Sequence, residues 1–373
     1  MICGITKISL DNYRKPEYFY SGFFVMENVD YIIVGDGYAS LFFAHQLIKN
    51  NKSFVVFSEE KKNASRVSAG IINPVVLKKF TTFWKAQEQI DFLKQTLSEI
   101  KEYTGQDYLI DAPIHRIFHD ENEQQLWLKK SSNEDLTNFL DKNFTHLEGV
   151  KNDFNSGKVN QSARLDVSGF FMGLYSFLEN DKHFIKEKFR YSDLDTFELT
   201  YKNFRYKNIL FCEGMGVKEN PFFSDIPVNA NKGHHIKVNL SQPLPENITI
   251  KKKHFLFPLD DNTYFYGGTY DREQLHHEVD SVAVEQLTNG LKEFYPHDFS
   301  IKEVNFGFRP TVKDRRPIIG RHHQHQNMYV FNGLGARGIL NGCYFSKSLY
   351  DYIENDIPLH EEVSLERFGP RLL

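Results

Sequence analysis

The sequence has few cysteines and no long hydrophobic run. Its three cysteines among 373 residues stand far apart without a CxxC pair, which argues against a disulfide framework or a zinc cluster and favours a reducing compartment. No apolar stretch approaches the ~20 residues that span a bilayer. A net charge of −4 gives no basic footprint for nucleic acid. We therefore expect a cytoplasmic protein without a membrane span, a metal site or a nucleic-acid partner.

A glycine-rich turn stands out near the start, in the stretch DYIIVGDGYASLFFAHQL at 30–47. An apolar strand, a turn and an amphipathic helix follow one another here, as in a dinucleotide cradle. Gly35 would permit the tight turn and Gly37 the approach of backbone to a pyrophosphate at the helix N-terminus. Ser40 replaces the third glycine, where a small residue lets the helix pack against the strand. The ribose contact at the end of the second strand falls on Ser58 or on Glu59, and the sequence leaves both open.

The position of this cradle also bears on the N-terminus. Met26 stands just ahead of the first strand, and dinucleotide-binding chains usually begin that strand within a few residues of their start. Our hypothesis is that Met26 is the native start. Residues 1–28 would then form an N-terminal tail, of which 1–25 are either upstream translation or a loose tail.

Three further motifs carry a resemblance to a known family. They are ASRVSAGIINP at 64–74, FCEGMG at 211–216, and FGFRPTVKDRRPIIG with YVFNGLGARGIL within 306–340. Together with the cradle they resemble the FAD-dependent oxidoreductases of the D-amino-acid oxidase and glycine oxidase family, from Asp30 to about Ile353. The resemblance implies FAD as cofactor. Nothing matches the covalent flavin cysteine of sarcosine oxidases, so we expect FAD to bind non-covalently.

The resemblance also assigns the residues that would hold FAD. A reduced flavin carries negative charge, and a second glycine turn would aim backbone N–H groups and a helix N-terminus at it, which favours FAD over a nicotinamide cofactor. Ser65 and Arg66 could contact the pyrophosphate or merely cap their loop. The expected cofactor-binding residues are Gly35, Gly37, Ser40, Ser58, Glu59, Ser65, Arg66, Gly70, Gly214, Gly333, Gly335 and Gly338.

Two arginines are the candidate catalytic residues. Arg309 stands in GFRP, where the family holds the substrate carboxylate, and a planar guanidinium binds a carboxylate with two parallel bonds. The alternative is a structural arginine paired with Asp314. Arg337 lies in the second glycine turn and could be a second anion contact or a helix cap.

The family resemblance implies oxidation of the C–N bond of an amino acid or related secondary amine by hydride transfer to flavin N5. Water would hydrolyse the resulting imine, and dioxygen or another acceptor would reoxidise the flavin. One alternative is an oxidase for a carboxymethylaminomethyl-type tRNA uridine, whose oxidase domain shares the GLGxRG type of turn. A second alternative is a non-catalytic flavin-binding protein.

The order of apolar runs predicts an α/β fold with an α+β substrate part. A Rossmann-like FAD-binding domain with a parallel sheet would interleave with an antiparallel-sheet substrate domain. The first would comprise 29–79, 160–232 and 306–373, and the second 80–159 and 233–305. Helical spacing predicts helices at 80–104 and 281–295, and one in two pieces at 121–145.

Overall fold

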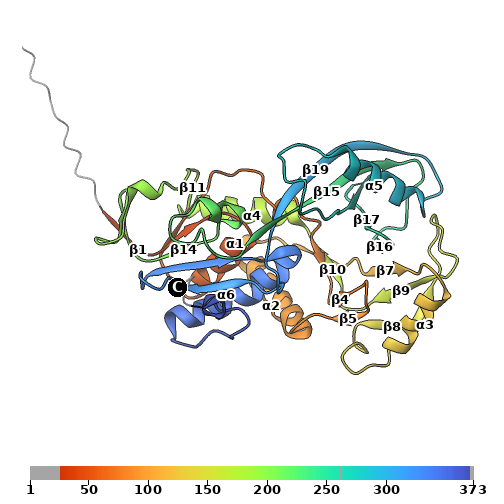
Figure 1. The fold of residues 1–373 in the computed structure, drawn as a ribbon, viewed down its shortest axis with the longest axis horizontal. Helices are drawn as coiled ribbons and strands as arrows, with labels where there is room; N and C mark the ends of the chain where they lie inside the picture. Colours follow the sequence, from red (N-terminus) through yellow and green to blue (C-terminus); the bar gives the residue numbers. More distant parts are fainter. Residues whose placement is uncertain (1–25, 261, 370–373) are drawn as a thin grey trace, which may run out of the picture.

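The computed structural model describes residues 26–260 and 262–369, and two large sheets organise this part of the chain (Figure 1). Residues 1–25 of the expected tail lie outside the described residues, and Glu27 already begins strand β1. No helix in the described part is long and apolar enough to cross a membrane.

The first sheet, at the left of Figure 1, has a parallel centre in the order β11-β2-β1-β14, with β21 also parallel to β14. Its central strands are buried on both faces, as in other parallel sheets covered by helices. In the described ranges its strands are β1 (Glu27–Val34), β2 (Phe54–Phe57), β11 (Phe184–Ile185), β12 (Leu194–Asp195), β13 (Thr200–Tyr201), β14 (Phe204–Phe211), β20 (Ile318–Arg321) and β21 (Met328–Asn332).

Four helices share a hydrophobic core with this sheet: α1 (Tyr38–Lys49), α2 (Ala86–Thr104), α4 (Val167–Asn180) and α6 (Gly338–Glu354). Helix α1 packs along α6, and α2 packs on α6 as well. The turn between β1 and α1 therefore lies close to the second glycine turn, which precedes α6.

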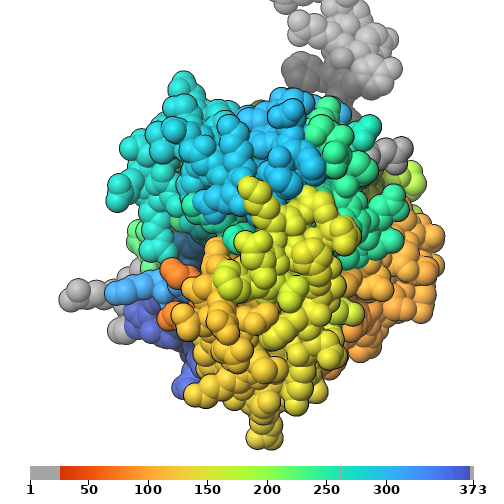
Figure 2. Space-filling model, turned by 90° about the vertical axis from the view of Figure 1, so that its right-hand side faces the viewer, coloured from red at the N-terminus to blue at the C-terminus, as the bar shows by residue number. Residues whose placement is uncertain are grey.

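The second sheet, at the right of Figure 1, is largely antiparallel, in the order β19-β15-β18-β17-β16-β7-β9-β8. Helix α5 (Ser281–Lys292) covers one of its faces. In Figure 2 the yellow region around helix α3 (Glu121–Lys130) lies below the cyan region of α5. The strands are β7 (Ile114–Ile117), β8 (Leu140–Thr145), β9 (Ser156–Val159), β15 (Asn229–Leu240), β16 (Thr249–Lys251), β17 (Phe255–Pro258), β18 (Thr263–Gly267) and β19 (Phe299–Thr311).

Long strands and small sheets join the two parts. Strands β15 and β19 run from the second sheet into the first part, and the small sheets lie between them (Figure 1). These small sheets comprise β3 (Ile71–Ile72), β6 (Leu109–Ile110) and β10 (Ala163–Leu165), and the pair β4 (Val75–Val76) and β5 (Thr81–Thr82). The expected fold class, with a parallel and an antiparallel sheet, is confirmed. The domain limits stay a prediction.

One expected helix is wrong in its second half. The segment 121–145 was expected to be helical in two pieces, but only α3 is a helix, and 140–145 forms strand β8. Leu140 pairs with Val159 of β9, and the Phe144 ring lies 5.3 Å from that of Phe118. Pairing with β9 therefore outweighs the local helical pattern.

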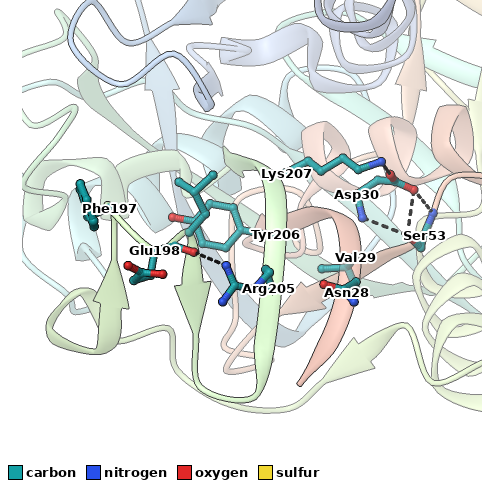
Figure 3. Close-up of a pocket in the computed structure, with 10 residues that line it drawn as sticks. Asn28, Val29, Asp30, Ser53, Phe197, Glu198, Arg205, Tyr206 and Lys207 are labelled. Carbon is teal, nitrogen blue, oxygen red and sulfur yellow. Dashed lines mark hydrogen bonds and ion pairs between the residues drawn. The ribbon is translucent and has the colours of Figure 1, made fainter. Parts of the chain in front are cut away.

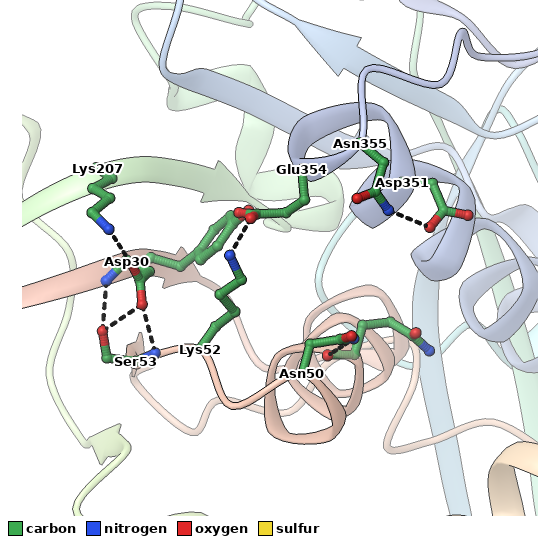
Figure 4. A network of polar contacts seen from close by, with 10 residues as sticks. Asp30, Asn50, Lys52, Ser53, Lys207, Asp351, Glu354 and Asn355 are labelled. Carbon is green, nitrogen blue, oxygen red and sulfur yellow. Dashed lines mark hydrogen bonds and ion pairs between the residues drawn. The ribbon is translucent and has the colours of Figure 1, made fainter.

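A polar network ties the amino-terminal end of β1 to its neighbours (Figure 4). Asp30 accepts hydrogen bonds from the Ser53 hydroxyl at 2.8 Å and from Lys207 Nζ at 2.6 Å. Partial burial raises the pKa of Asp30, but these bonds outweigh it and lower the pKa to about 2. The carboxylate therefore stabilises the fold above its unfolded pKa near 3.8, and this contribution is lost as pH falls towards 2.

Asp30→Asn should lower the free energy of unfolding by about 1 kcal/mol at neutral pH, because the ion pair with Lys207 is lost. The effect is no larger because Lys207 is 76% exposed and solvent screens the pair. The difference from the parent should shrink as pH falls through the window from 3.8 to 2, which urea titrations at several pH values would measure. Asp298→Asn, at an exposed carboxylate, is the control. An equal effect of both substitutions, or a difference that grows in acid, would contradict the assignment.

Candidate functional site

The carboxyl ends of β1, β14 and β21 meet at one edge of the first sheet. The chain leaves β1 towards β2 on one side, while β14 pairs on the other, so the strand order reverses between β1 and β14. Gly35 follows β1 with φ +111°, and a Cβ there would lie 2.4 Å from the carbonyl oxygen of Cys212, just after β14. Only glycine permits this approach. In open α/β sheets, such a reversal point is where ligands bind.

The N-terminus of α1 opens at this edge. Gly37 precedes the helix, which has no side-chain cap, and the Tyr38 N–H donates to Ser65 Oγ at 3.3 Å. A Cβ on Gly37 would lie 3.0 Å from the same Oγ. Ser40 is fully buried and donates to the Gly35 carbonyl at 2.7 Å, so it holds the turn from within. The free N–H groups and helix dipole suit an anion such as a pyrophosphate.

A second helix begins beside the first. Gly333 and Gly335 have φ of +72° and +59°, and α6 then starts at Gly338 without a side-chain cap. A Cβ on Gly338 would lie 2.9 Å from Tyr38 Cδ2, so α1 and α6 start side by side. Neither helix has an acidic residue in its first turn. Two helix N-termini therefore offer positive ends to one crevice, as a bound anionic cofactor requires.

Two more of the expected glycines border the same crevice. The Gly214 carbonyl accepts a hydrogen bond from Asn332 Nδ2 at 2.9 Å, which joins the ends of β14 and β21. Gly70 precedes β3, and a Cβ there would lie 2.3 Å from the carbonyl oxygen of Leu165 on β10. The glycines of the two turns and Gly214 thus come together in space, although they are far apart in the chain, whereas the close contact of Gly70 is with β10.

Sequence reasoning missed two polar residues in the crevice. Asp36, between the cradle glycines, is buried and accepts a hydrogen bond from Asn63 Nδ2 at 2.8 Å. Burial raises the pKa of Asp36. The nearby Ser58 hydroxyl and the charge of Arg66 lower it, but by less. Asn63 Oδ1 also accepts from the backbone N–H groups of Ser65 and Arg66 at 3.0 Å each. The N-x-S spacing at 63–65, typical of an Asx turn, was the available signal.

The two candidates for the ribose contact differ in their surroundings. Ser58 is buried, and its Oγ accepts a hydrogen bond from the Glu60 N–H at 2.9 Å. Glu59 instead pairs with Lys61 and lies 3.9 Å from Lys188 at the surface. These contacts favour Ser58 as the residue that faces the cofactor.

We therefore expect Ser58→Ala to weaken FAD binding by up to about tenfold, as for a neutral hydrogen bond, and Glu59→Ala to change it by less than about threefold. Titration of apoprotein with FAD, followed by quenching of flavin fluorescence, measures both. If FAD binding is tenfold weaker in Glu59→Ala and unchanged in Ser58→Ala, then Glu59 is the residue that contacts the ribose.

Arg309 lies on β19, and its guanidinium lies over Gly233 of the neighbouring strand β15. Its Nη1 donates to Asn231 Oδ1 at 3.0 Å and to the Thr269 carbonyl at 3.1 Å, and the Tyr270 ring lies 4.5 Å from Cζ. A Cβ on Gly233 would lie 2.2 Å from Nη1 and Nη2, so this glycine makes room for the guanidinium. The hydrogen bonds recorded among the described residues all come from Nη1, so Nε and Nη2 retain hydrogens for a ligand.

The alternative interpretation, in which Arg309 is a structural arginine paired with Asp314, is wrong. Asp314 accepts a hydrogen bond from Arg367 Nε at 3.0 Å and another from the Arg316 backbone. Arg337 precedes α6, but its side chain does not cap the helix and lies over the Phe83 ring at 4.5 Å. Burial, and then the charges of Arg315 and Arg316, lower the pKa of Arg337. The helix cap is therefore ruled out as the role of the Arg337 side chain, and the anion contact stays a prediction.

A pocket of about 550 Å³ lies elsewhere, at the amino-terminal end of β1 (Figure 3). It is lined by Asn28, Asp30, Ser53, Arg205 and by Phe197, whose side chain is 90% exposed. Because Gly35 follows the opposite end of β1, this pocket is separate from the crevice described above.

The described cysteines and acidic groups provide no metal centre or reactive thiol. Within 26–260 and 262–369, no three His, Cys, Asp or Glu side chains could together hold a metal ion. Cys212 and Cys343 are buried, and burial raises the pKa of Cys343 to about 12. Both thiols therefore stay protonated at neutral pH, which suits a cofactor held without a covalent bond.

Comparison with known proteins places the chain among flavoproteins. The profile of the family described as FAD dependent oxidoreductase (DAO) matches residues 30–351. The structure is similar to iminodiacetate oxidase from Chelativorans sp. BNC1 (TM-score 0.74, 15% identity, 90% of this chain and 99% of that one). It is also similar to glycine oxidase from Geobacillus kaustophilus (TM-score 0.73, 16% identity, 88% and 95%).

One curated relative is the tRNA 5-methylaminomethyl-2-thiouridine biosynthesis bifunctional protein of Haemophilus ducreyi. It is 19% identical over 97% of this chain and 62% of its own length. The chain spans between 18% and 62% of the length of the curated relatives that it matches.

Proposed function

Because the chain belongs to the family of FAD-dependent oxidoreductases, we propose that it oxidises the C–N bond of an amino acid or related secondary amine that carries a carboxylate. Its cofactor is FAD, and the crevice fits that group, since two uncapped helix N-termini and a glycine turn gather there. Membership of an oxidoreductase family replaces the interpretation as a non-catalytic flavin-binding protein.

The observation that carries the proposal is the setting of Arg309. Asn231 and Thr269 fix the guanidinium through Nη1. Burial lowers the pKa of Arg309, yet an arginine stays charged at neutral pH. Arg309 is half-buried and has no acidic partner among the described residues, so an anion would stabilise it, and the remaining N–H groups can bind a carboxylate with two parallel bonds.

The residues around Arg309 then orient the substrate. When bound, FAD would supply the acceptor for the hydride, and thus for the two electrons, that leaves the carbon next to nitrogen. Arg309 would fix the carboxylate and hence the direction of that C–H bond, while the Tyr270 ring stacks on the guanidinium and helps to hold its plane. Burial lowers the pKa of the nearby His235 to about 3, so its imidazole is neutral and a poor base. A substrate amine that binds unprotonated needs none.

Anaerobic reduction of the bound FAD by amines with and without a carboxylate tests this proposal. The electron acceptor, dioxygen or another oxidant, and a cytoplasmic location remain predictions.

A second candidate is oxidation of a carboxymethylaminomethyl uridine in tRNA. The match that spans 97% of this chain is to a tRNA-modifying protein, which favours it. The net charge of −4 opposes it. Reduction of FAD by tRNA that carries the modified uridine, but not by free glycine derivatives, would establish this candidate. Reduction by free amino acids or N-substituted amino acids would establish the first.

A further inference from the structure

A second arginine, which is buried, has no anionic partner among the residues that the structure describes. Arg164 on β10 is 7% exposed, and its buried Nε has no hydrogen-bond partner among the described residues. Burial lowers the pKa of Arg164 to about 10, which the charge of Asp166 opposes, so the group stays cationic at neutral pH. Asp166 itself accepts the Gly169 N–H at 3.0 Å, at the start of α4. A buried guanidinium in this state is unfavourable unless an anion joins it.

The guanidinium of Arg164 lies on an aromatic wall of the second sheet. Its Cζ is 4.2 Å from the centre of the Phe257 ring. Phe257 stacks on Phe265 at 4.7 Å and 8°, and Phe265 stacks on His235 at 4.5 Å and 28°. Three flat rings from β17, β18 and β15 thus form one continuous surface, with the cation of Arg164 at its end.

Arg309 faces the same side of this sheet. Its guanidinium overlies Gly233 of β15, two residues before His235. Since side chains alternate along a strand, Gly233 and His235 belong to one face. Lys232 and His234, on the opposite face, lie towards the segment before α5. The aromatic wall therefore shares its face with two arginines, of which Arg164 is buried and Arg309 half-buried.

This face also meets the loop assigned to the cofactor. Arg164 pairs with Ile71, which follows Gly70, and the Leu165 N–H donates to the Gly70 carbonyl at 2.7 Å. At the other end, a Cβ on Gly307 of β19 would lie 2.6 Å from Val67 Cγ2. Arg164, the wall and Arg309 thus border one region between the cofactor loop and the second sheet.

We propose that Arg164 binds a second anionic group of the substrate, so that the substrate is an amine with two acid groups joined by an apolar spacer. This inference rests on the proposed function, in which Arg309 binds the first carboxylate. The rings of Phe257 and Phe265 would contact the spacer, and Arg164 would select dianionic amino acids or N-carboxyalkyl amino acids over those with one carboxylate.

Binding of unreactive acids to the holoenzyme tests the proposal without turnover. The probes are linear α,ω-dicarboxylates of increasing chain length and their monoamides, measured by calorimetry. We expect one length of dicarboxylate to bind about tenfold or more tightly than its monoamide, as for an added charged hydrogen bond. Equal binding of acid and monoamide at every length in the parent protein would overturn the proposal, and this comparison needs no variant.

Variants then locate the second contact. Arg164→Met should abolish the preference for the dicarboxylate and leave monoamide binding unchanged, while Arg164→Lys should retain part of the preference. Arg205→Met, at an exposed arginine, is the control. A preference that persists in folded Arg164→Met protein with FAD bound would overturn the proposal. Binding of the monoamide tests Arg309, which would hold its single carboxylate. If Arg309→Lys leaves monoamide binding unchanged, the proposed function is contradicted, independently of the result for Arg164.

Discussion

The Arg309→Lys variant should retain FAD and the melting temperature of the parent. The amine substrate should nevertheless reduce its flavin about 100-fold more slowly. An ammonium group is a point charge and cannot reproduce the planar fork that Asn231 and Thr269 hold from one side. A carboxylate bound to it would be displaced, and small displacements of a reacting group carry losses of this size. Because the same contact binds and aligns the substrate, kcat should fall and KM should rise.

The control for this prediction is Arg367→Lys, because Arg367 is the arginine that pairs with Asp314. We expect it to lower the melting temperature slightly and to leave the rate of flavin reduction per bound FAD unchanged. Stopped-flow reduction and thermal unfolding of the same preparations separate the two effects. An unchanged reduction rate in Arg309→Lys, with a lowered melting temperature, would remove Arg309 from the site.

Gly37→Val should abolish retention of FAD. The φ of −82° at Gly37 suits any residue, so backbone strain is not the cause. Its Cβ would already lie 3.0 Å from Ser65 Oγ, and the two methyl groups of valine would extend into the N-terminus of α1, where the pyrophosphate is expected. The ratio of bound FAD to protein, from the flavin and protein absorbance, measures the loss.

Graded substitutions at the same position control for misfolding. Gly37→Ala should weaken FAD binding less than valine does, because its single methyl group extends less far towards the N-terminus of α1. Circular dichroism establishes that each variant is folded. A folded Gly37→Val protein with one FAD per chain would contradict the placement of the pyrophosphate.

Local sequence predicted the cradle well because its chemistry is local. The apolar strand, the two glycines and the helix of 30–47 follow one another in the chain, and the structure places β1, the turn and α1 accordingly. The replacement of the third glycine is also understood, since the Ser40 hydroxyl is bonded to the Gly35 carbonyl within the turn. A short polar side chain satisfies its own hydrogen bond there.

The surroundings of the arginines could not be predicted in the same way. Asn231 and Thr269 lie 78 and 40 positions from Arg309, on and beside other strands, and no pattern near Arg309 points to them. Near Arg164, the sequence pattern predicts only the start of α4. The aromatic rings that surround the guanidinium come from β17 and β18, which are distant in the chain. Strand β8 was missed because pairing with β9 decides its conformation.

The measurement that tests the central claim most directly is anaerobic titration of the oxidised holoenzyme with matched pairs of amines. Each pair comprises an amino acid or N-substituted amino acid and the same amine without its carboxylate. We expect at least one carboxylate-bearing member to bleach the oxidised flavin, and its decarboxylated partner to do so far more slowly. Equally fast bleaching by both members, or no bleaching by any amine in the panel, would contradict the claim that Arg309 binds a substrate carboxylate for C–N oxidation.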